Sequence, residues 1–286
     1  MKKNAVFHLL IGALLFFVAC KSNRFGGMTL YTVREDMKTN PKEVIKKIAD
    51  IGYTHIEATG YADGKFYGMT PVEFKNYLQS LKLTPLSTHQ GTATLDNADA
   101  MIADVKAAGF QYFVIPVPPM GRFKFDPATK TMNMADDLDF MVNFLNTVGK
   151  KCADAGLELL YHNHDFEFKK NAKGIVPMDY FLANVDPKYV NFQLDLYWIT
   201  KAGADPIAYF EKYPGRWKLW HVKDMDTQGR FAPVGNGTID FAKILAKKDV
   251  AGMKQYIVEQ DMTFDKMLPL QAITISHEGL KKFGFH

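Results

Sequence analysis

The chain concentrates polar groups at the end of a hydrophobic run, in the segment LYHNHDFEF at residues 159–167. Leu159 to Tyr161 have the composition of a buried strand. The polar side chains that follow are His162, Asn163, His164, Asp165 and Glu167. Imidazoles and carboxylates are costly to bury unless a partner group or a cation satisfies them. The segment therefore predicts a metal site or a pocket for a polar substrate.

Other short apolar runs of the chain also end in polar side chains. These are Glu57, His89, Asp195, His221, Lys223 and Glu259. Any one of them could be a buried group that its own neighbours satisfy. Several at the ends of different strands are harder to explain in that way, because carboxylates and imidazoles gathered in a dry pocket repel one another or stay unsatisfied. A bound cation would join them.

The elements that position these groups can be read from helix starts and apolar runs. A capping side chain precedes proline, with Glu at the third helical position, in Asn40-Pro41-Lys42-Glu43 and in Thr70-Pro71-Val72-Glu73. In each, the cap oxygen should accept from a backbone amide while Glu returns a bond to the cap. The pattern predicts helices over about 41–51 and 71–82.

Short apolar runs alternate with the helices and predict eight strands. The runs are Met28–Val33, His55–Ala58, Thr84–His89, Tyr112–Val117, Leu157–His162, Val190–Leu196, Lys218–Lys223 and Gln255–Glu259. Strands that alternate with helices imply parallel βαβ units, and eight units in this length predict a single α/β domain, a (β/α)8 TIM barrel. The carboxyl ends of its strands would converge on one face. The insertion at about Pro118–Asn133 should project from that face.

The segment after the seventh strand, HVKDMDTQGRFAPVGNGTIDF at residues 221–241, resembles the xylose-isomerase-like barrel superfamily of sugar isomerases and epimerases. It contains the family's strand-7 His, a Lys-Asp pair, a variable loop, Gly-x-Gly and an Ile-Asp that opens the next helix. IEATGY, STHQG and QLDLYW fit the family after strands 2, 3 and 6. The resemblance covers almost the whole chain after its first twenty residues and implies a carbohydrate substrate.

The resemblance also implies one divalent metal, which such enzymes commonly hold with Glu, Asp, His and Glu from strands 5 to 8. Asp195, His221 and Glu259 match the last three positions, whereas His162 stands where the family often has Glu. Two imidazoles with two carboxylates suit Mn, Zn, Fe, Co or Ni better than Ca. The expected cofactor is one ion of Mn, Zn, Co, Fe, Ni or Mg.

The replacement of the strand-5 Glu affects the expected mechanism. Epimerases of the family exchange protons on the two faces of the sugar with the strand-5 and strand-8 Glu residues, and only Glu259 remains here. His164 lies two residues beyond His162 on the same face of its strand. The expected catalytic residues are Glu259, His164 and Lys223. The expected substrate contacts are Glu57, His89, Glu167, Trp198 and Arg230.

Three classes of function can be compared with these residues. The first is a metal-dependent isomerase or epimerase that acts through an enediolate on a neutral or keto sugar, with a lyase or hydratase of keto-glycosides as its alternative. The second is a non-catalytic sugar-binding lipoprotein. An apurinic-site endonuclease is disfavoured, because the net charge is only +4 and Trp198 occupies a place where that chemistry uses His. Nucleic acid is not an expected partner, and a homo-oligomer is compatible with the sequence.

The first twenty residues have the pattern of an export signal. Lys2 and Lys3 precede an apolar run from Ala5 to Val18 that is too short to span a bilayer, and the run ends in Ala19-Cys20. This resembles the lipobox of bacterial lipoproteins; an ordinary signal peptide is the alternative. We expect a signal peptide at 1–19, a barrel domain at 20–286, and a lipid on Cys20 that anchors the exported protein, facing the periplasm. That lipid would be its one contact with the membrane.

Overall fold

The structure is a computed structural model that describes residues 24–119, 121–126, 131–134 and 136–286. The expected signal peptide and Cys20 lie outside the described residues. None of the helices within the described ranges is long and apolar enough to cross a bilayer.

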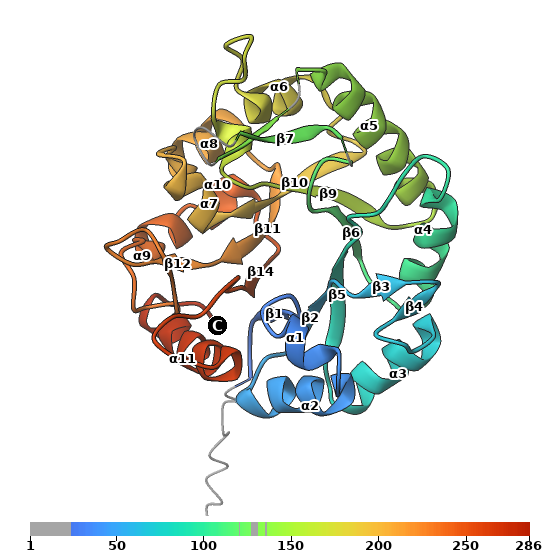
Figure 1. Ribbon diagram of the computed structural model, residues 1–286, viewed down its shortest axis with the longest axis vertical. Helices are drawn as coiled ribbons and strands as arrows, with labels where there is room; N and C mark the ends of the chain where they lie inside the picture. The colour runs from blue at the N-terminus through green and yellow to red at the C-terminus, as the bar shows by residue number, and fades with distance from the viewer. Residues whose placement is uncertain (1–23, 120, 127–130, 135) are drawn as a thin grey trace, which may run out of the picture.

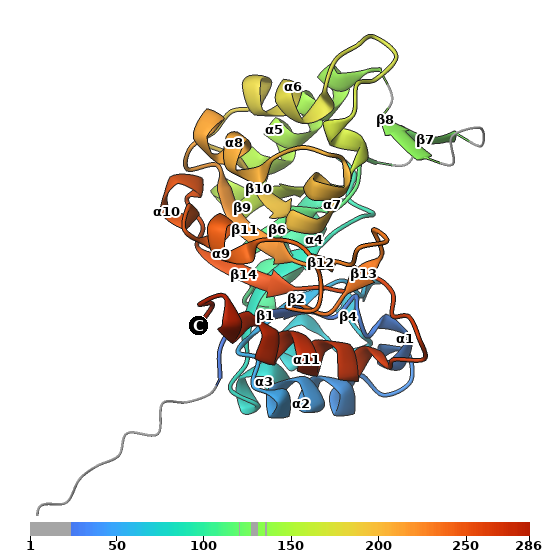
Figure 2. The same cartoon turned by 90° about the vertical axis from the view of Figure 1, so that its left-hand side faces the viewer.

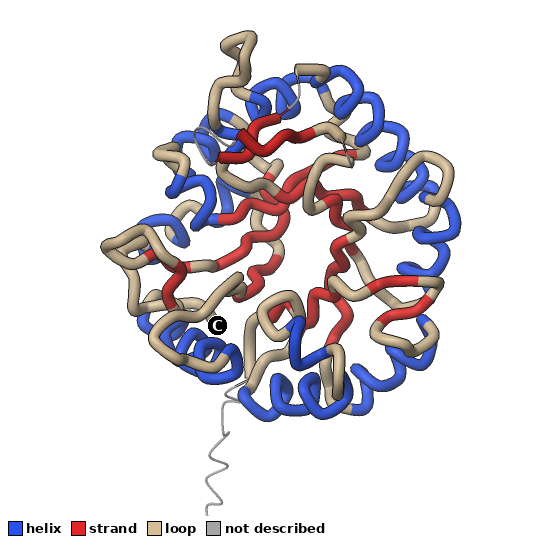
Figure 3. The backbone as a smooth tube through the Cα atoms, viewed as in Figure 1, coloured by secondary structure: helices blue, strands red, loops and turns tan. Residues whose placement is uncertain are grey.

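Eight parallel strands form a closed barrel (Figures 1 and 3), which confirms the expected (β/α)8 fold. β1 pairs with β2 on one side and with β14 on the other, so the sheet has no free edge. In chain order the strands are β1 (Gly27–Thr29), β2 (His55–Ala58), β5 (Thr84–His89), β6 (Tyr112–Ile115), β9 (Glu158–His162), β10 (Val190–Asp195), β11 (Trp217–Val222) and β14 (Gln255–Val258).

Helices surround the barrel and follow its strands in turn (Figure 1). They are α2 (Pro41–Ile51), α3 (Pro71–Ser80), α4 (Ala98–Ala107), α5 (Leu138–Asp154), α6 (Pro177–Asn184), α8 (Pro206–Lys212), α9 (Phe241–Leu245), α10 (Lys248–Ala251) and α11 (Pro269–Lys282). Each packs apolar side chains on the outside of the barrel, so most of the hydrophobic core lies between the strands and the helices.

The two predicted helix starts are present, with one difference between them. At α3, Thr70 Oγ1 accepts from the Glu73 amide and the Glu73 carboxylate accepts from the Thr70 amide, a complete capping box. At α2, Asn40 accepts from the Glu43 amide, but the Glu43 carboxylate accepts from the side-chain amide of Asn40. An Asn cap carries its own donor, so the Glu bonds to it instead of the backbone.

The first strand is shorter than the sequence predicts. β1 ends at Thr29 instead of Val33, because the chain turns there into the short helix α1 (Arg34–Met37). Thr32 Oγ1 accepts from the Gln260 amide at 2.9 Å, which ties this turn to the segment after β14. Residues 30–33 therefore form part of the face where the strands end and not part of the sheet.

Additional short elements follow the carboxyl ends of the strands. They are the hairpins β3 (Tyr61–Ala62) with β4 (Lys65–Phe66), β7 (Phe123–Asp126) with β8 (Thr131–Met134), and β12 (Asp224–Met225) with β13 (Phe231–Ala232), and the helices η1 (Phe166–Phe168) and α7 (Leu196–Lys201). Figure 2 shows all three hairpins and α1 at the same end of the barrel. The β7–β8 hairpin projects from this end, as expected of the insertion after the fourth strand.

The inside of the barrel has two distinct levels. An apolar cluster, which we call the inner layer, consists of Leu86, Tyr112, Val114, Leu160, Leu219 and Ile257. Two residues further along three of these strands lie His162, His221 and Glu259, because inward positions recur with period two. We call the side chains at this second level, toward the carboxyl ends, the polar layer: Glu57, His89, His162, Gln193, Asp195, His221, Lys223 and Glu259.

Candidate active site

A cavity of about 540 Å³ opens above the polar layer at the carboxyl ends of the strands. Six of the residues that the sequence singled out line it: His89, His162, His164, Trp198, Lys223 and Glu259. In a barrel of this kind the face at the strand carboxyl ends carries the active site. The location and lining of this cavity make it the candidate active site.

Four side chains in the polar layer have the arrangement of a metal site. His162, Asp195, His221 and Glu259 each place one donor atom within 4.8 Å of the others, and all four are buried. The strand register brings them together, since Asp195 of β10 is the pairing partner of His221 of β11. The Nδ1 atom of His162 is buried and has no hydrogen-bond partner among the described residues. This donor set fits a divalent ion.

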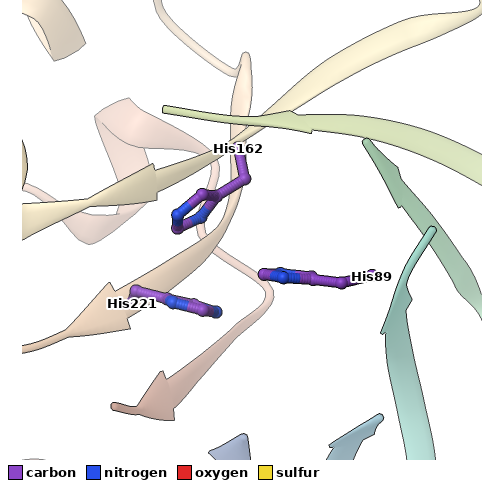
Figure 4. A group of neighbouring side chains, drawn as sticks. All are labelled: His89, His162 and His221. Carbon is purple, nitrogen blue, oxygen red and sulfur yellow. The ribbon is translucent and has the colours of Figure 1, made fainter. Parts of the chain in front are cut away.

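A third imidazole lies beside this group. Figure 4 shows His89, His162 and His221 converging from three different strands. The rings of His89 and His221 are nearly parallel, with centroids 5.5 Å apart, and His89, His162 and His221 form a second set of donor atoms within 4.8 Å of one another. His89 therefore lies at the edge of the candidate metal site and faces the cavity.

His221 lies between two carboxylates. Its Nδ1 atom is 2.8 Å from Glu259 Oε2, and its Nε2 atom is 2.7 Å from Glu57 Oε1. Burial lowers the pKa of His221, but Glu57 and Glu259 outweigh that effect and raise it to about 10. His162 differs, because burial and the neighbouring His221 hold its pKa well below the usual range. The two imidazoles therefore carry different charge although they lie side by side.

Lys223 places an ammonium group among the carboxylates of the site. Its Nζ atom is 2.7 Å from Glu259 Oε2, 2.9 Å from Asp195 Oδ2 and 3.1 Å from Asp261 Oδ1. Burial lowers the pKa of Lys223, but Asp195, Asp261 and Glu259 raise it well above the usual range, so the group stays charged. It offsets the negative charge of the acidic side chains and lines the cavity at the same time.

Asp261 is a cavity residue that our sequence reasoning missed. It pairs with Lys223, and burial raises its pKa to about 6 although Lys223 opposes the shift. The signal was present, because Asp261 follows Glu259 by two residues, the spacing that keeps side chains on one face. The other lining residues that sequence reasoning missed come from the turns and short elements beyond the strand ends and include Tyr31, Arg34, Tyr61, Phe231 and Met262.

The HNH segment alternates as its spacing predicts. His162 and His164 both line the cavity, with ring centroids 5.1 Å apart. Asn163 lies between them, and its Oδ1 atom accepts from the Asp195 amide at 3.0 Å, which ties the ends of β9 and β10 together. Burial lowers the pKa of His164 to about 3, so its imidazole is neutral at physiological pH. The cluster thus consists of two cavity groups and one structural amide.

Glu167 does not lie where a sugar contact requires it. Its side chain is fully buried and does not line the cavity. One carboxylate oxygen accepts from the Tyr161 hydroxyl at 2.6 Å and the other from the His164 amide at 2.8 Å. The short helix η1 turns the side chain inward, so Glu167 supports the backbone of His164. Burial raises the pKa of Glu167 to about 7.

Two more expected substrate contacts lie away from the cavity lining. Glu57 is fully buried within the polar layer, where it bonds to other side chains of the barrel. Arg230 lies on the hairpin after β11, donates from Nε to Asp226 at 2.8 Å, and stacks on the Phe264 ring. Its guanidinium therefore braces its own loop.

The loop after β11 is held by a single buried carboxylate. Asp224 accepts hydrogen bonds from the backbone amides of Met225, Gly235, Gly237 and Ile239. A Cβ atom at Gly237 would lie 2.2 Å from the Asp224 carboxylate, so only glycine fits there. This arrangement fixes the β12–β13 hairpin, which places Phe231 in the wall of the cavity.

Comparison with known proteins agrees with this geometry. The family model described as "Xylose isomerase-like TIM barrel" matches residues 45–260. A solved structure of a sugar phosphate isomerase/epimerase from Parabacteroides distasonis superposes with a TM-score of 0.80 at 25% identity, over 96% of this chain and 99% of that chain. A structure of the IOLI protein with a bound zinc atom has the same fold, with a TM-score of 0.68 at 14% identity, over 92% of this chain and 99% of that one.

Curated relatives match over a shorter stretch. An inosose dehydratase from Clostridium botulinum is 26% identical over 147 residues, which are 44% of this chain and 48% of that protein. The chain thus spans about half the length of the curated relatives it matches. The family model covers well over half of the chain and includes seven of the eight barrel strands. The chain therefore belongs to the xylose isomerase-like TIM barrel family.

Proposed function

We propose that this protein is a metal-dependent enzyme that moves a proton on the carbon next to a carbonyl group of a sugar. The observation that carries the proposal is the convergence of His162, Asp195, His221 and Glu259 beneath a cavity lined by acid–base side chains. A divalent ion at these four residues would polarise the carbonyl oxygen and stabilise the negative charge that develops there.

The residues around the cavity have distinct roles in this proposal. The Lys223 ammonium group faces the cavity and supplies positive charge beside the reacting atoms. His164 presents a neutral imidazole, which can accept from one sugar hydroxyl and donate to another. Glu259 reaches both the candidate metal site and the cavity, so it is the carboxylate placed to exchange a proton with the substrate.

Isomerisation or epimerisation is the first form of this chemistry, and dehydration is the second. The P. distasonis structure that superposes over nearly the whole chain is named a sugar phosphate isomerase/epimerase. The curated relatives are named inosose dehydratases. His162 stands where the family often has the second proton-exchanging Glu, which favours a reaction that needs a single carboxylate base. Both reactions begin with loss of a proton next to a carbonyl group.

The test is deuterium exchange. The purified chain, loaded with Zn²⁺, Mn²⁺ or Co²⁺ in turn, is incubated with free and 3-keto sugars in D₂O, and products are followed by NMR and mass spectrometry. Deuterium uptake at a carbon next to a carbonyl supports the proposal, and loss of water from the same substrate identifies a dehydratase. His162→Ala is the matched control and should abolish the uptake.

A sugar-binding protein without catalysis would give a different result. If the metal-loaded protein binds a sugar saturably but no sugar of the panel takes up deuterium, the protein is a sugar-binding protein and the proposed enzyme activity is wrong. A tryptophan fluorescence titration follows the binding, because the indole of Trp198 lines the cavity, and Trp198→Phe shows how much of the signal comes from the buried Trp217 and Trp220.

Export as a lipoprotein is the proposed setting for this activity. It is supported by the apolar run that ends in Ala19-Cys20. Cys20→Ser should block lipid labelling and leave precursor or released protein. Cys152 is a buried thiol, so Cys152→Ser is the control and should leave lipid labelling unchanged. Unchanged membrane association of the Cys20→Ser protein would refute the anchor.

A further inference from the structure

Glu57 is the most highly connected carboxylate of the polar layer. Its Oε1 atom lies 2.7 Å from His221 Nε2 and 3.1 Å from His89 Nε2. Its Oε2 atom accepts from Ser87 Oγ at 2.8 Å and from Gln193 Nε2 at 2.6 Å. The donors come from β5, β10 and β11, so a single fully buried side chain of β2 contacts three other strands. No open position remains on it for a substrate.

The contact with Glu57 fixes a hydrogen on one nitrogen of His221. A carboxylate only accepts hydrogen bonds, so the Nε2 atom that faces Glu57 must be the donor. The opposite nitrogen, Nδ1, lies 2.8 Å from Glu259 Oε2 and 3.9 Å from Asp195 Oδ2, the other candidate metal ligands. By the same reasoning Nδ1 of the charged ring donates to Glu259; a metal ion at the site would take the place of that Nδ1 hydrogen, while Nε2 keeps its own.

The same reasoning applies to His89. Its Nε2 atom lies 3.1 Å from Glu57 Oε1 and 2.9 Å from Gln193 Oε1, and both oxygens are acceptors. Hydrogen on Nε2 leaves Nδ1 of the neutral ring as an acceptor, on a residue that lines the cavity. Glu57 thus contacts two of the three converging imidazoles of Figure 4 through the same kind of ring atom.

We propose that Glu57 is a positioning residue that holds hydrogen on Nε2 of His221 and so presents Nδ1 of that ring to the metal ion. This inference rests on the proposed metal site but not on the sugar chemistry. Carboxylates that bind the far nitrogen of a metal-ligating histidine fix its ring orientation and raise its basicity, and their removal weakens metal binding by about 10- to 100-fold. A purely structural Glu57 would lower stability and leave metal affinity unchanged.

The first experiment is a calorimetric titration of the full chain with Zn²⁺. Glu57→Gln keeps the shape of the side chain and removes its charge, so we expect zinc affinity about 10- to 100-fold below wild type. Glu158→Gln is the matched control. Glu158 lies on the barrel strand β9, outside the cavity lining, and its carboxylate accepts a hydrogen bond from the side-chain amide of Asn191. Its substitution should change zinc affinity by less than about twofold.

The second measurement uses the wild-type protein and does not depend on how the variant folds. Nitrogen-15 NMR of the histidine rings in the zinc-loaded chain should show His221 bound through Nδ1, with hydrogen on Nε2. Binding through Nε2 would overturn the proposal, as would wild-type zinc affinity in a folded Glu57→Gln protein. Either result leaves the metal site standing, whereas a wild-type chain that binds no Zn²⁺ removes the metal site and this inference together.

Discussion

On three strands of the barrel, residues of the inner layer and the polar layer lie only two positions apart, yet the two layers have opposite physical character. Leu160 and Leu219 are buried among other apolar side chains, whereas His162 and His221, one inward position further along, are buried among charges. Both layers are largely buried, although the polar layer also forms the floor of the cavity. The inner layer gains free energy from burial, at about 25 cal/mol for each Å² of apolar surface. Burial of the polar layer costs free energy unless its charges are compensated.

This difference shows how the barrel separates stability from chemistry. In the polar layer, positive charge on Lys223 and His221 offsets the carboxylates of Glu57, Asp195 and Glu259. His162 has a lowered pKa and carries no charge to be offset, and its Nδ1 atom has no hydrogen-bond partner in the described part of the chain. We therefore expect substitutions in the two layers to affect different measurable quantities.

The largest effect on function is expected for His162→Ala. The substitution removes one of four candidate metal donors but breaks no hydrogen bond at Nδ1, so the fold should persist. Loss of a residue that only hydrogen-bonds to a metal ligand lowers metal affinity by about 10- to 100-fold. Zinc affinity of His162→Ala should fall by more than that, and metal-dependent activity should fall with it. Metal analysis and calorimetry measure the loss. Full zinc occupancy at normal affinity would move the metal site elsewhere.

The converse substitution lies in the inner layer. Leu219→Ala should lower the free energy of unfolding by about 2–5 kcal/mol, because it leaves a cavity among close-packed side chains. Zinc affinity of the folded protein should stay close to wild type, since the side chain is not among the candidate metal donors. Denaturant unfolding in the presence of EDTA gives the stability. A Leu219→Ala protein of normal stability but weakened zinc binding would reverse the comparison between the layers.

A smaller and pH-dependent effect is expected at Glu167. Burial raises its pKa from 4.5 to about 7, so its contribution to stability is complete below about pH 4.5 and is lost as the pH rises through 7. The loss is at most about 3 kcal/mol. Glu167→Gln resembles the protonated form and keeps partners for Tyr161 and the His164 amide.

The measurement compares the free energy of unfolding at pH 5 and pH 8. Wild type should lose stability over this interval by up to about 3 kcal/mol more than Glu167→Gln does. Glu158→Gln alters a carboxylate of β9, the strand that precedes η1, and should show the same difference in free energy of unfolding between the two pH values as wild type. Parallel pH profiles for wild type and Glu167→Gln would show that this carboxylate does not titrate in the interval.

The smallest effect is expected at Arg230. Its guanidinium pairs with Asp226 on its own loop and lies outside the cavity lining, so Arg230→Ala should change KM by less than about twofold. Trp198→Ala, in the wall of the cavity, is the comparison and should raise KM further. Steady-state kinetics with the sugar found by deuterium exchange separate the two. A large rise in KM for Arg230→Ala would place its loop over the bound substrate.

The barrel and the convergence of its strand ends could be predicted because they follow from local patterns. Capping residues mark the helix starts, and the period of two places His162 and His164 on one face. The orientation of Glu167 could not be predicted in this way, since it depends on the turn of η1. The burial of Glu57 depends on contacts from three other strands, which spacing along one strand does not reveal.

The way Asp195 begins α7 limits how it can bind a cation. One carboxylate oxygen, Oδ1, accepts from the Trp198 amide at 2.8 Å and caps the helix, which leaves Oδ2 for the site. Chelation by both oxygens would make Oδ1 share its electron density between the helix amide and the cation, which weakens both contacts. An ion at the proposed metal site would therefore be contacted by Asp195 mainly through Oδ2, an arrangement that would suit ions of low coordination number such as Zn²⁺ better than Ca²⁺, whose six to eight oxygen positions often include bidentate carboxylates. Selectivity among metals would then be set partly by a helix cap.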